Sequence, residues 1–168
     1  MANPNKQKGT AWESAVRDYL NRVLGLSAED GRPVDPFDAL NVRRAAQEGA
    51  KDVGDVHAVP FILECKDVTK GAVPTFLRQA EVEAVNAGFP YGVAVVKVRR
   101  ANVSVGRVHY TVRTWTRVRL ALGLNSRTFA QRYGFTMSLR GTDTGRWYAT
   151  QSLADFAQVL DDIRRLSR

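Results

Sequence analysis

The sequence predicts an α/β fold in which helices flank a mixed central sheet, followed by a C-terminal α+β extension. Two short apolar segments, Val56 to Val59 and Phe61 to Cys65, are too brief for helices and are typical of strands joined tightly at Pro60. A helical segment, Pro74 to Ala87, separates the second strand from the nearly continuous apolar run Tyr91 to Val98. Strand, helix and strand in this order form a β-α-β unit within one sheet.

The composition is that of one globular domain. The chain has 168 residues, of which 44% are hydrophobic, enough for a substantial core. No apolar run approaches the ~20 residues of a membrane span, and the polar N-terminus lacks the apolar region of a signal peptide. The single cysteine, Cys65, excludes an intramolecular disulfide and a cysteine-based zinc cluster. We therefore expect a cytoplasmic protein that does not bind membranes.

The charge balance favours a nucleic-acid partner. Lys and Arg number 25 against 17 Asp and Glu, which gives a net charge of +8. Such an excess is typical of proteins that bind a polyanion, although it can also serve solubility alone. The basic residues fall in groups, which favours binding. Those expected to contact DNA are Lys6, Lys8, Arg43, Arg44, Lys51, Lys70, Arg99 and Arg100.

The chain begins with a basic segment and a helix. Residues 1–9 are expected to form a mobile arm, followed by a helix from Thr10 to Leu24 with one apolar stripe. Thr10 as N-cap and Glu13 three residues later form a capping box. Glu13 either completes that cap or faces the catalytic pocket, and the spacing alone favours the cap.

A short strand and a polar loop are expected before the central strands. The strand covers Ala39 to Ala45 and carries Arg43 and Arg44, which either hold phosphates or face solvent. The loop, residues 47–53, is polar and contains glycine, so it is expected to be flexible.

The helix Pro74 to Ala87 has proline at its start and Gly88 just after its end, as helices favour. Gln79 lies beside its buried stripe, near the helix start, and can point back toward the strand that precedes the helix. Glu81 and Glu83 are interpreted as an exposed face.

The extension, residues 106–168, is expected to pack on the same domain as residues 1–105. Ser152 and Asp155 suggest a second capping box. Its expected elements are a strand from His109 to Trp115, a basic helical segment over 117–133, a hairpin over 135–151 and a helix from Leu153 to Leu166.

The strongest chemical signal lies between Gly54 and Lys66. Because side chains alternate across a strand, Glu64 and Lys66 share one face at the end of an otherwise buried strand. If this strand pairs with the preceding one, Asp55 approaches Glu64. Two carboxylates beside a lysine suit a hard divalent cation bound through oxygen, with the lysine near the attacking water or the phosphate.

Two neighbouring residues compete for roles in this site. Asp52 is an alternative to Asp55, but Asp55 follows a glycine and precedes the apolar run, which places it at the start of a strand. His57 is a candidate base, although a lone histidine is more often a hydrogen-bonded structural residue.

These features together resemble the PD-(D/E)xK nuclease superfamily and, within it, the archaeal-type Holliday junction resolvases. The resemblance covers residues 6–98. An acid followed by Glu-x-Lys is short and weakly specific alone, but it gains weight from the order of elements and the basic charge. One departure is Gly54, which stands where the superfamily has proline. The motifs that carry the resemblance are Lys8-Gly9 with Glu13, Gly54-Asp55, Ile62-Leu63-Glu64-Cys65-Lys66 and Gln79.

The resemblance implies a restriction-endonuclease-like core, α-β-β-β-α-β, within residues 1–105. By resemblance, Asp55 and Glu64 would coordinate Mg²⁺ or Mn²⁺, helped by the Cys65 backbone carbonyl. Lys66 would activate water and stabilise the phosphate, Glu13 would complete the acidic cluster, and Gln79 would support the site. It also implies a homodimer that cuts four-way DNA junctions during recombination or repair.

Three other functions remain open on sequence grounds. One is a different nuclease of the same superfamily, restriction-like or active in repair. Another is a non-catalytic DNA-binding module, against which the intact Asp55, Glu64 and Lys66 argue. The last is a structural protein in which Glu64 and Lys66 form a plain salt bridge. Metal-dependent cleavage separates nucleases from the rest, and salt-sensitive DNA binding separates the last two.

Overall fold

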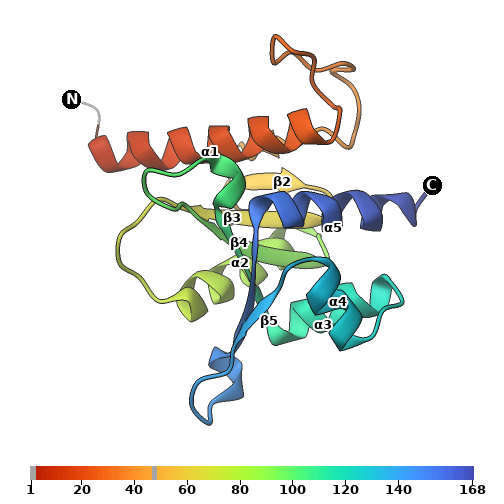
Figure 1. The fold of residues 1–168 in the computed structure, drawn as a ribbon. Helices are drawn as coiled ribbons and strands as arrows, with labels where there is room; N and C mark the ends of the chain where they lie inside the picture. Colours follow the sequence, from red (N-terminus) through yellow and green to blue (C-terminus); the bar gives the residue numbers. More distant parts are fainter. Residues whose placement is uncertain (1–2, 47–48) are drawn as a thin grey trace.

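In a computed structural model, which describes residues 3–46 and 49–168, the chain forms an α/β fold around a seven-stranded mixed sheet (Figure 1). The strand order is β1-β2-β3-β4-β5-β7-β6. The predicted class, a mixed sheet flanked by helices, is confirmed. The strands are β1 (Arg43–Arg44), β2 (Val56–Ala58), β3 (Phe61–Lys66), β4 (Tyr91–Val96), β5 (Arg107–Thr111), β6 (Thr136–Ser138) and β7 (Tyr148–Ser152).

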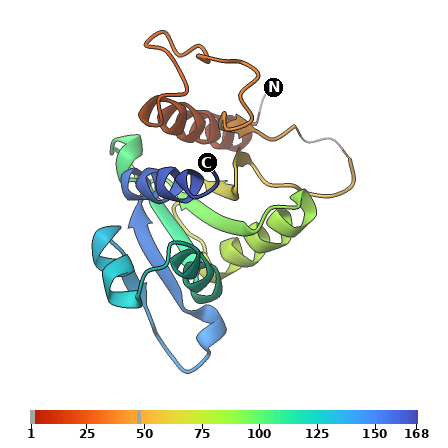
Figure 2. The ribbon, with the colours of Figure 1, turned by 90° about the vertical axis from the view of Figure 1, so that its right-hand side faces the viewer.

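Helices cover both faces of the sheet. The α-helices are α1 (Pro4–Val23), α2 (Val73–Ala87), α3 (Val112–Ala121), α4 (Ser126–Arg132) and α5 (Leu153–Arg165), with short 3-10 turns at Val103–Val105 and Thr144–Arg146. α1 and α5 lie on one side of the sheet and α2 on the other (Figure 2). None of the helices in the described part of the chain is long and apolar enough to cross a membrane.

The central strands and α2 follow the prediction. β2 and β3 pair antiparallel, with Val56 opposite Leu63, and β3 runs parallel to β4, with Phe61 opposite Tyr91. α2 connects β3 and β4, so the β-α-β unit is confirmed. Its C-cap, Gly88, adopts a left-handed conformation, as expected for a glycine that ends a helix.

The first helix begins earlier than predicted. α1 starts at Pro4, and the Asn3 side chain accepts a hydrogen bond of 3.0 Å from the Asn5 backbone N–H. An asparagine N-cap followed by proline is a strong helix start, which the prediction overlooked. The predictions of a mobile arm over residues 1–9 and of an N-cap at Thr10 are therefore wrong for the residues that the structure describes. Residues 1 and 2 lie outside the described part of the chain. Glu13 consequently sits inside the helix, where it caps nothing.

The first strand is also shorter than expected. β1 comprises only Arg43 and Arg44, paired with β2, and the rest of the predicted strand from Ala39 to Ala45 is loop. A loop was predicted over residues 47–53. Residues 47 and 48 of this loop lie outside the part of the chain that the structure describes.

The extension continues the same sheet. β5 pairs with β4, and β7 pairs with β5, so the sheet crosses the expected boundary at residue 105. The strand predicted over His109 to Trp115 is partly wrong: it ends at Thr111, whose hydroxyl caps α3 by accepting a hydrogen bond of 3.0 Å from the Thr114 N–H. The predicted hairpin forms from β6 and β7. The closing helix is α5, whose Phe156 packs on Phe61 with ring centroids 5.1 Å apart.

Candidate active site

The pairing of β2 with β3 brings two carboxylates together. Asp55 lies just before β2, and its Oδ2 accepts a hydrogen bond of 2.7 Å from the Cys65 N–H. Glu64, in β3, is only 3% exposed. Burial, followed by repulsion from Glu64, raises the pKa of Asp55 to about 7. The two acids that the sequence singled out are therefore neighbours in an environment that disfavours two negative charges.

Lys66 completes this group from the end of β3. Its ammonium forms an ion pair with Glu64 and donates a hydrogen bond of 3.2 Å to Gln79 Oε1. It also lies 5.5 Å from the centre of the Phe76 ring. Burial alone would lower the pKa of Lys66, but the hydrogen bond and charge of Glu64 outweigh it, so the pKa is raised. Lys66 is thus a fixed positive charge at neutral pH.

Glu13 lies nearby but is held by an arginine. Both Nε and Nη2 of Arg44 donate to Glu13 Oε2, at 3.0 and 2.8 Å. The charge of Glu13 still contributes to the raised pKa of Asp55. Arg43 donates to the backbone carbonyls of Pro36 and Asp38. Both arginines line a cavity of about 390 Å³ next to the 25–42 loop. A different cavity, described below, is lined by Lys66, and neither arginine contributes to it.

The competing residues Asp52 and His57 stabilise local structure. Asp52 is exposed, and its Oδ1 accepts a hydrogen bond of 3.1 Å from the Gly54 N–H. His57 Nε2 lies 2.8 Å from the Val53 carbonyl oxygen. Because a carbonyl only accepts, this nitrogen carries the proton. The geometry therefore places Asp55, and not Asp52, against Glu64.

The structure adds one acid that the sequence analysis misplaced. Glu83 was expected on an exposed face of α2, but it is 1% exposed, and neither carboxyl oxygen has a hydrogen-bond partner among the described residues. Burial and the adjacent Glu64 raise its pKa to about 9, so it is neutral at pH 7. Its spacing of three and four residues from Ala80 and Gln79 was a signal that it faces the sheet. Glu81 is half-buried and accepts a 2.7 Å hydrogen bond from the Thr111 hydroxyl.

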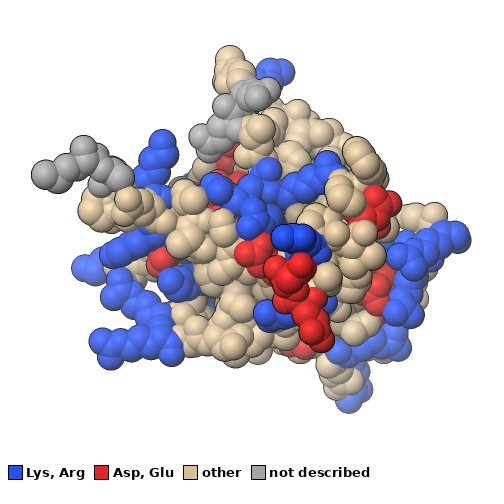
Figure 3. Space-filling model, turned by 90° about the horizontal axis from the view of Figure 1, so that it is seen from above, with Lys and Arg blue, Asp and Glu red and all other residues tan. Residues whose placement is uncertain are grey.

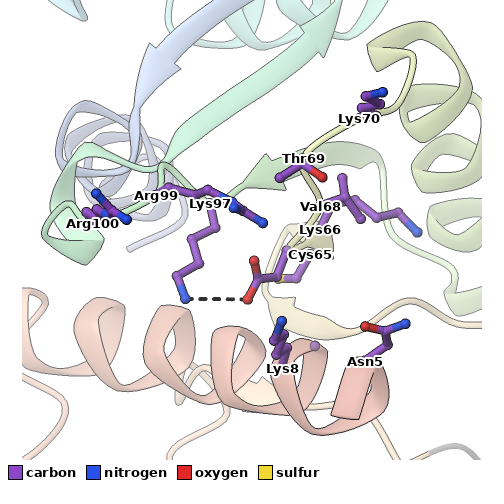
Figure 4. Close-up of a pocket in the computed structure, with 12 residues that line it drawn as sticks. Asn5, Lys8, Cys65, Lys66, Val68, Thr69, Lys70, Lys97, Arg99 and Arg100 are labelled. Atoms are coloured by element: carbon purple, nitrogen blue, oxygen red, sulfur yellow. Dashed lines mark hydrogen bonds and ion pairs between the residues drawn. The ribbon is translucent and has the colours of Figure 1, made fainter. Parts of the chain in front are cut away.

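A basic cavity opens beside Lys66. Seen from the α1 side, one group of Lys and Arg side chains gathers at the end where α1 begins (Figure 3). A cavity of about 750 Å³ lies between this end of α1, the end of β3, the β3–α2 loop and the residues after β4 (Figure 4). We call it the basic pocket. Its basic lining residues are Lys8, Lys66, Lys70, Lys97, Arg99 and Arg100.

Four of the predicted DNA contacts, Lys8, Lys70, Arg99 and Arg100, thus meet in one cavity. Lys97 was not predicted; it is half-buried, and its ammonium lies 3.4 Å from Asp67 Oδ2 (Figure 4). Its place at the end of an apolar strand, like that of Lys66, was the available signal. The other predicted contacts lie elsewhere: Lys6 is exposed on α1, and Lys51 lines a small cavity in its own loop.

The oxygen donors fit a magnesium ion. Within residues 3–46 and 49–168, no group of three or more His, Cys, Asp or Glu side chains is arranged to hold a metal. However, Mg²⁺ commonly keeps several waters and uses only one or two carboxylates. Asp55 and Glu64 are two such carboxylates, the Cys65 carbonyl is the further donor that the resemblance implies, and a cation would relieve the repulsion that helps to raise the pKa of Asp55. The chemistry of these donors therefore suits Mg²⁺ or Mn²⁺.

A scan against protein-family models gave no match, and searches of curated proteins and of solved structures found no similar chain. Functional assignment therefore depends on the side chains in and around the basic pocket.

Proposed function

We propose that this chain is a metal-dependent DNA endonuclease with a restriction-endonuclease-like core, and that four-way junctions are its preferred substrate. The observation that carries the proposal is the juxtaposition of Asp55, Glu64 and Lys66, of which Lys66 lines the basic pocket. A plain salt bridge between Glu64 and Lys66 would not require a second, destabilised carboxylate beside it. Neither would it require a pocket with six cations along its walls.

In the proposed phosphodiester hydrolysis, each residue of the site has a separate role. Mg²⁺ bound by Asp55 and Glu64 would supply a Lewis acid and an activated water. Lys66, as a permanent ammonium, offsets the charge that gathers on the phosphate oxygens in the transition state. Gln79 holds the Lys66 ammonium in place, and the Cys65 N–H fixes the Asp55 carboxylate. The other cations of the basic pocket would hold the DNA backbone through its phosphates.

The direct test is cleavage of a labelled four-way junction beside duplex, single-stranded and flap DNA, with Mg²⁺, Mn²⁺ or EDTA. Paired symmetric nicks confined to the junction support a resolvase that acts as a homodimer in recombination or repair. Metal-dependent cutting of other substrates retains the nuclease and discards the resolvase. Binding without cutting under either metal leaves a DNA-binding module.

Three substitutions test the assignment of residues. Asp55→Asn, Glu64→Gln and Lys66→Ala are each expected to lower the cleavage rate roughly 10²-fold or more, because each removes a charge used in the transition state. DNA affinity in EDTA should change little. Glu29→Gln, which changes an exposed acid in the 25–42 loop, is the matched control and should cut normally. Normal cleavage by all three variants would show that the site is wrongly assigned.

A further inference from the structure

A second cavity, of about 370 Å³, adjoins the basic pocket on the α2 side of the sheet. The first turn of α2, the β3–α2 loop and strands β4, β5 and β7 surround it. It shares five lining residues with the basic pocket, which are Val68, Thr69, Lys70, Lys97 and Arg99. The two cavities therefore adjoin each other along these residues; we call the second one the aromatic pocket and the two together the groove.

The walls of the aromatic pocket differ from those of the basic pocket. Phe76 and Tyr148 supply two half-buried rings, and His109 supplies a buried imidazole. Burial, followed by the charge of Arg107, lowers the pKa of His109 to about 4, so this ring is neutral at pH 7. Every described residue lining the pocket is apolar, neutral polar or basic, and the cations are Lys70, Lys97, Arg99 and Arg107. The aromatic pocket thus combines flat, uncharged ring surfaces with positively charged side chains, and no carboxylate is among its described lining residues.

Both rings of the aromatic pocket pack against neighbouring residues. Tyr148 and His109 stand on neighbouring strands, with ring centroids 5.4 Å apart and planes at 87°. The His109 imidazole is held in turn by a hydrogen bond of 2.7 Å between Nδ1 and the Thr150 hydroxyl. On the opposite wall, a Cβ on Gly71 would lie 2.3 Å from Phe76 Cζ, so the β3–α2 loop passes directly against this ring. Each ring therefore has a packing contact within the pocket wall.

The shape and charge together select one class of ligand. A DNA duplex is too wide for a pocket of this volume, and a phosphate alone would gain nothing from two aromatic rings. An unpaired nucleotide satisfies both features, because its base has a flat π-face and its flanking phosphates are negative. Phe76 also lies beside Lys66, so a base held here would belong to a strand that passes the proposed catalytic site.

We propose that the aromatic pocket binds an unpaired nucleotide of the DNA substrate, with the base against Tyr148 and Phe76 and the adjoining phosphates against Lys70, Arg99 and Arg107. This inference rests on the proposed function in taking DNA as the ligand. It makes the extension, through β5 and β7, part of substrate recognition. It also gives a physical reason for a preference for branched or interrupted DNA over continuous duplex.

The test measures binding in EDTA, so that cleavage plays no part. Fluorescence anisotropy compares a continuous duplex with the same duplex carrying a short unpaired segment. Tyr148→Ala is expected to weaken binding of the interrupted substrate roughly tenfold, because it removes an aromatic ring on which the base stacks. Affinity for the continuous duplex should stay within about twofold of wild type. Tyr148→Phe, which keeps the ring, should bind both substrates as wild type does.

Controls separate stacking from misfolding. Phe37→Ala removes an aromatic ring that is 91% exposed in the 25–42 loop and should leave both affinities unchanged. Phe76→Leu provides a second probe on the other wall of the pocket. A 2-aminopurine placed in the unpaired segment should be quenched by wild type and less so by Tyr148→Ala. An equal loss for both substrates, or no loss for either, overturns the proposal.

The outcomes also separate this inference from the proposed function. Selective loss of interrupted-substrate binding in Tyr148→Ala, without cleavage by wild type in Mg²⁺, keeps the pocket and discards the nuclease. Cleavage by wild type with unchanged binding by Tyr148→Ala does the reverse. If wild type binds neither substrate, both proposals fail.

Discussion

At the scale of residues, the candidate site contains more carboxyl groups than its one ammonium can balance. Lys66 pairs with Glu64, which leaves Asp55 and Glu83 against an already negative neighbour. The protein meets this imbalance with protons, since the pKa values of both groups are raised. A divalent cation at Asp55 and Glu64 would replace the proton on Asp55, whereas Glu83, on the buried face of α2, would keep its own.

Glu83→Gln is expected to stabilise the protein at high pH. The folded protein raises the pKa of Glu83 from its ordinary 4.5 to about 9, so it binds a proton that the unfolded chain releases. Stability therefore falls as pH rises from about 4.5 to about 9. Glutamine keeps the shape of a neutral carboxyl and has no proton to lose, so the variant should melt several degrees higher near pH 8.5.

The measurement is thermal unfolding in EDTA at about pH 5 and about pH 8.5, because the effect should appear only at the higher value. Glu29→Gln serves as the control, since this acid is exposed. A variant that melts below wild type near pH 8.5 would mean that Glu83 is charged and stabilising there.

At the scale of elements, the turn before β2 sets the position of Asp55. Gly54 has φ +86°, and an added Cβ would lie 2.3 Å from Ile62 Cγ2 and 3.2 Å from Glu83 Oε2. Proline, which the superfamily has at this position, is fixed near φ −65° and cannot adopt this conformation. The glycine therefore has a local cause in this chain, because the turn passes directly against Ile62 and Glu83.

Gly54→Ala should consequently destabilise the fold and displace Asp55. The left-handed conformation alone costs a non-glycine residue about 1 kcal/mol, and the contact with Ile62 adds an overpacking cost of about 1–3 kcal/mol. Gly31→Ala isolates the first contribution, because Gly31 has φ +82° with open space around it, so only the left-handed conformation is penalised there. Urea unfolding of both variants gives the difference. Equal losses of stability would show that the Ile62 contact relaxes freely.

The elements also show what could be predicted from sequence. The approach of Asp55 to Glu64 is predictable because it follows from strand alternation and a tight antiparallel connection. The early start of α1 was encoded locally in Asn3-Pro4 but was obscured by the more familiar pattern at Thr10 and Glu13.

Other features depend on tertiary contacts that the sequence does not display. The helical spacing of Glu83 from Ala80 indicates the sheet side of α2, but a buried glutamate contradicts ordinary burial preferences, so the contacts in the structure were needed to decide its position. The aromatic pocket joins Phe76 of the core to Tyr148 of the extension, residues that are far apart in the chain.

At the scale of the whole molecule, the groove is built from both halves of the chain. The basic pocket uses α1, the β3–α2 loop and the residues after β4, whereas the aromatic pocket adds β5 and β7 from the extension. Because one sheet carries β3, β5 and β7, Lys66 at the end of β3 and Tyr148 of the aromatic pocket are held in a fixed relation. Six of the chain's 25 Lys and Arg residues line the basic pocket, which forms one part of this groove.

The salt dependence of DNA binding tests whether the charge is localised in this way. Removing one cation that binds a phosphate should reduce the slope of log affinity against log salt by about 0.9, so Lys8→Ala combined with Arg99→Ala should reduce it by about 2. Arg165→Ala combined with Arg168→Ala removes the same charge at the end of α5, near the C-terminus and away from the start of α1 (Figure 1). This control should leave the slope unchanged between about 50 and 200 mM salt in EDTA. If both pairs of substitutions reduce the slope equally, DNA binds through positive charge spread over the whole surface. The basic pocket would then not be the DNA-binding site.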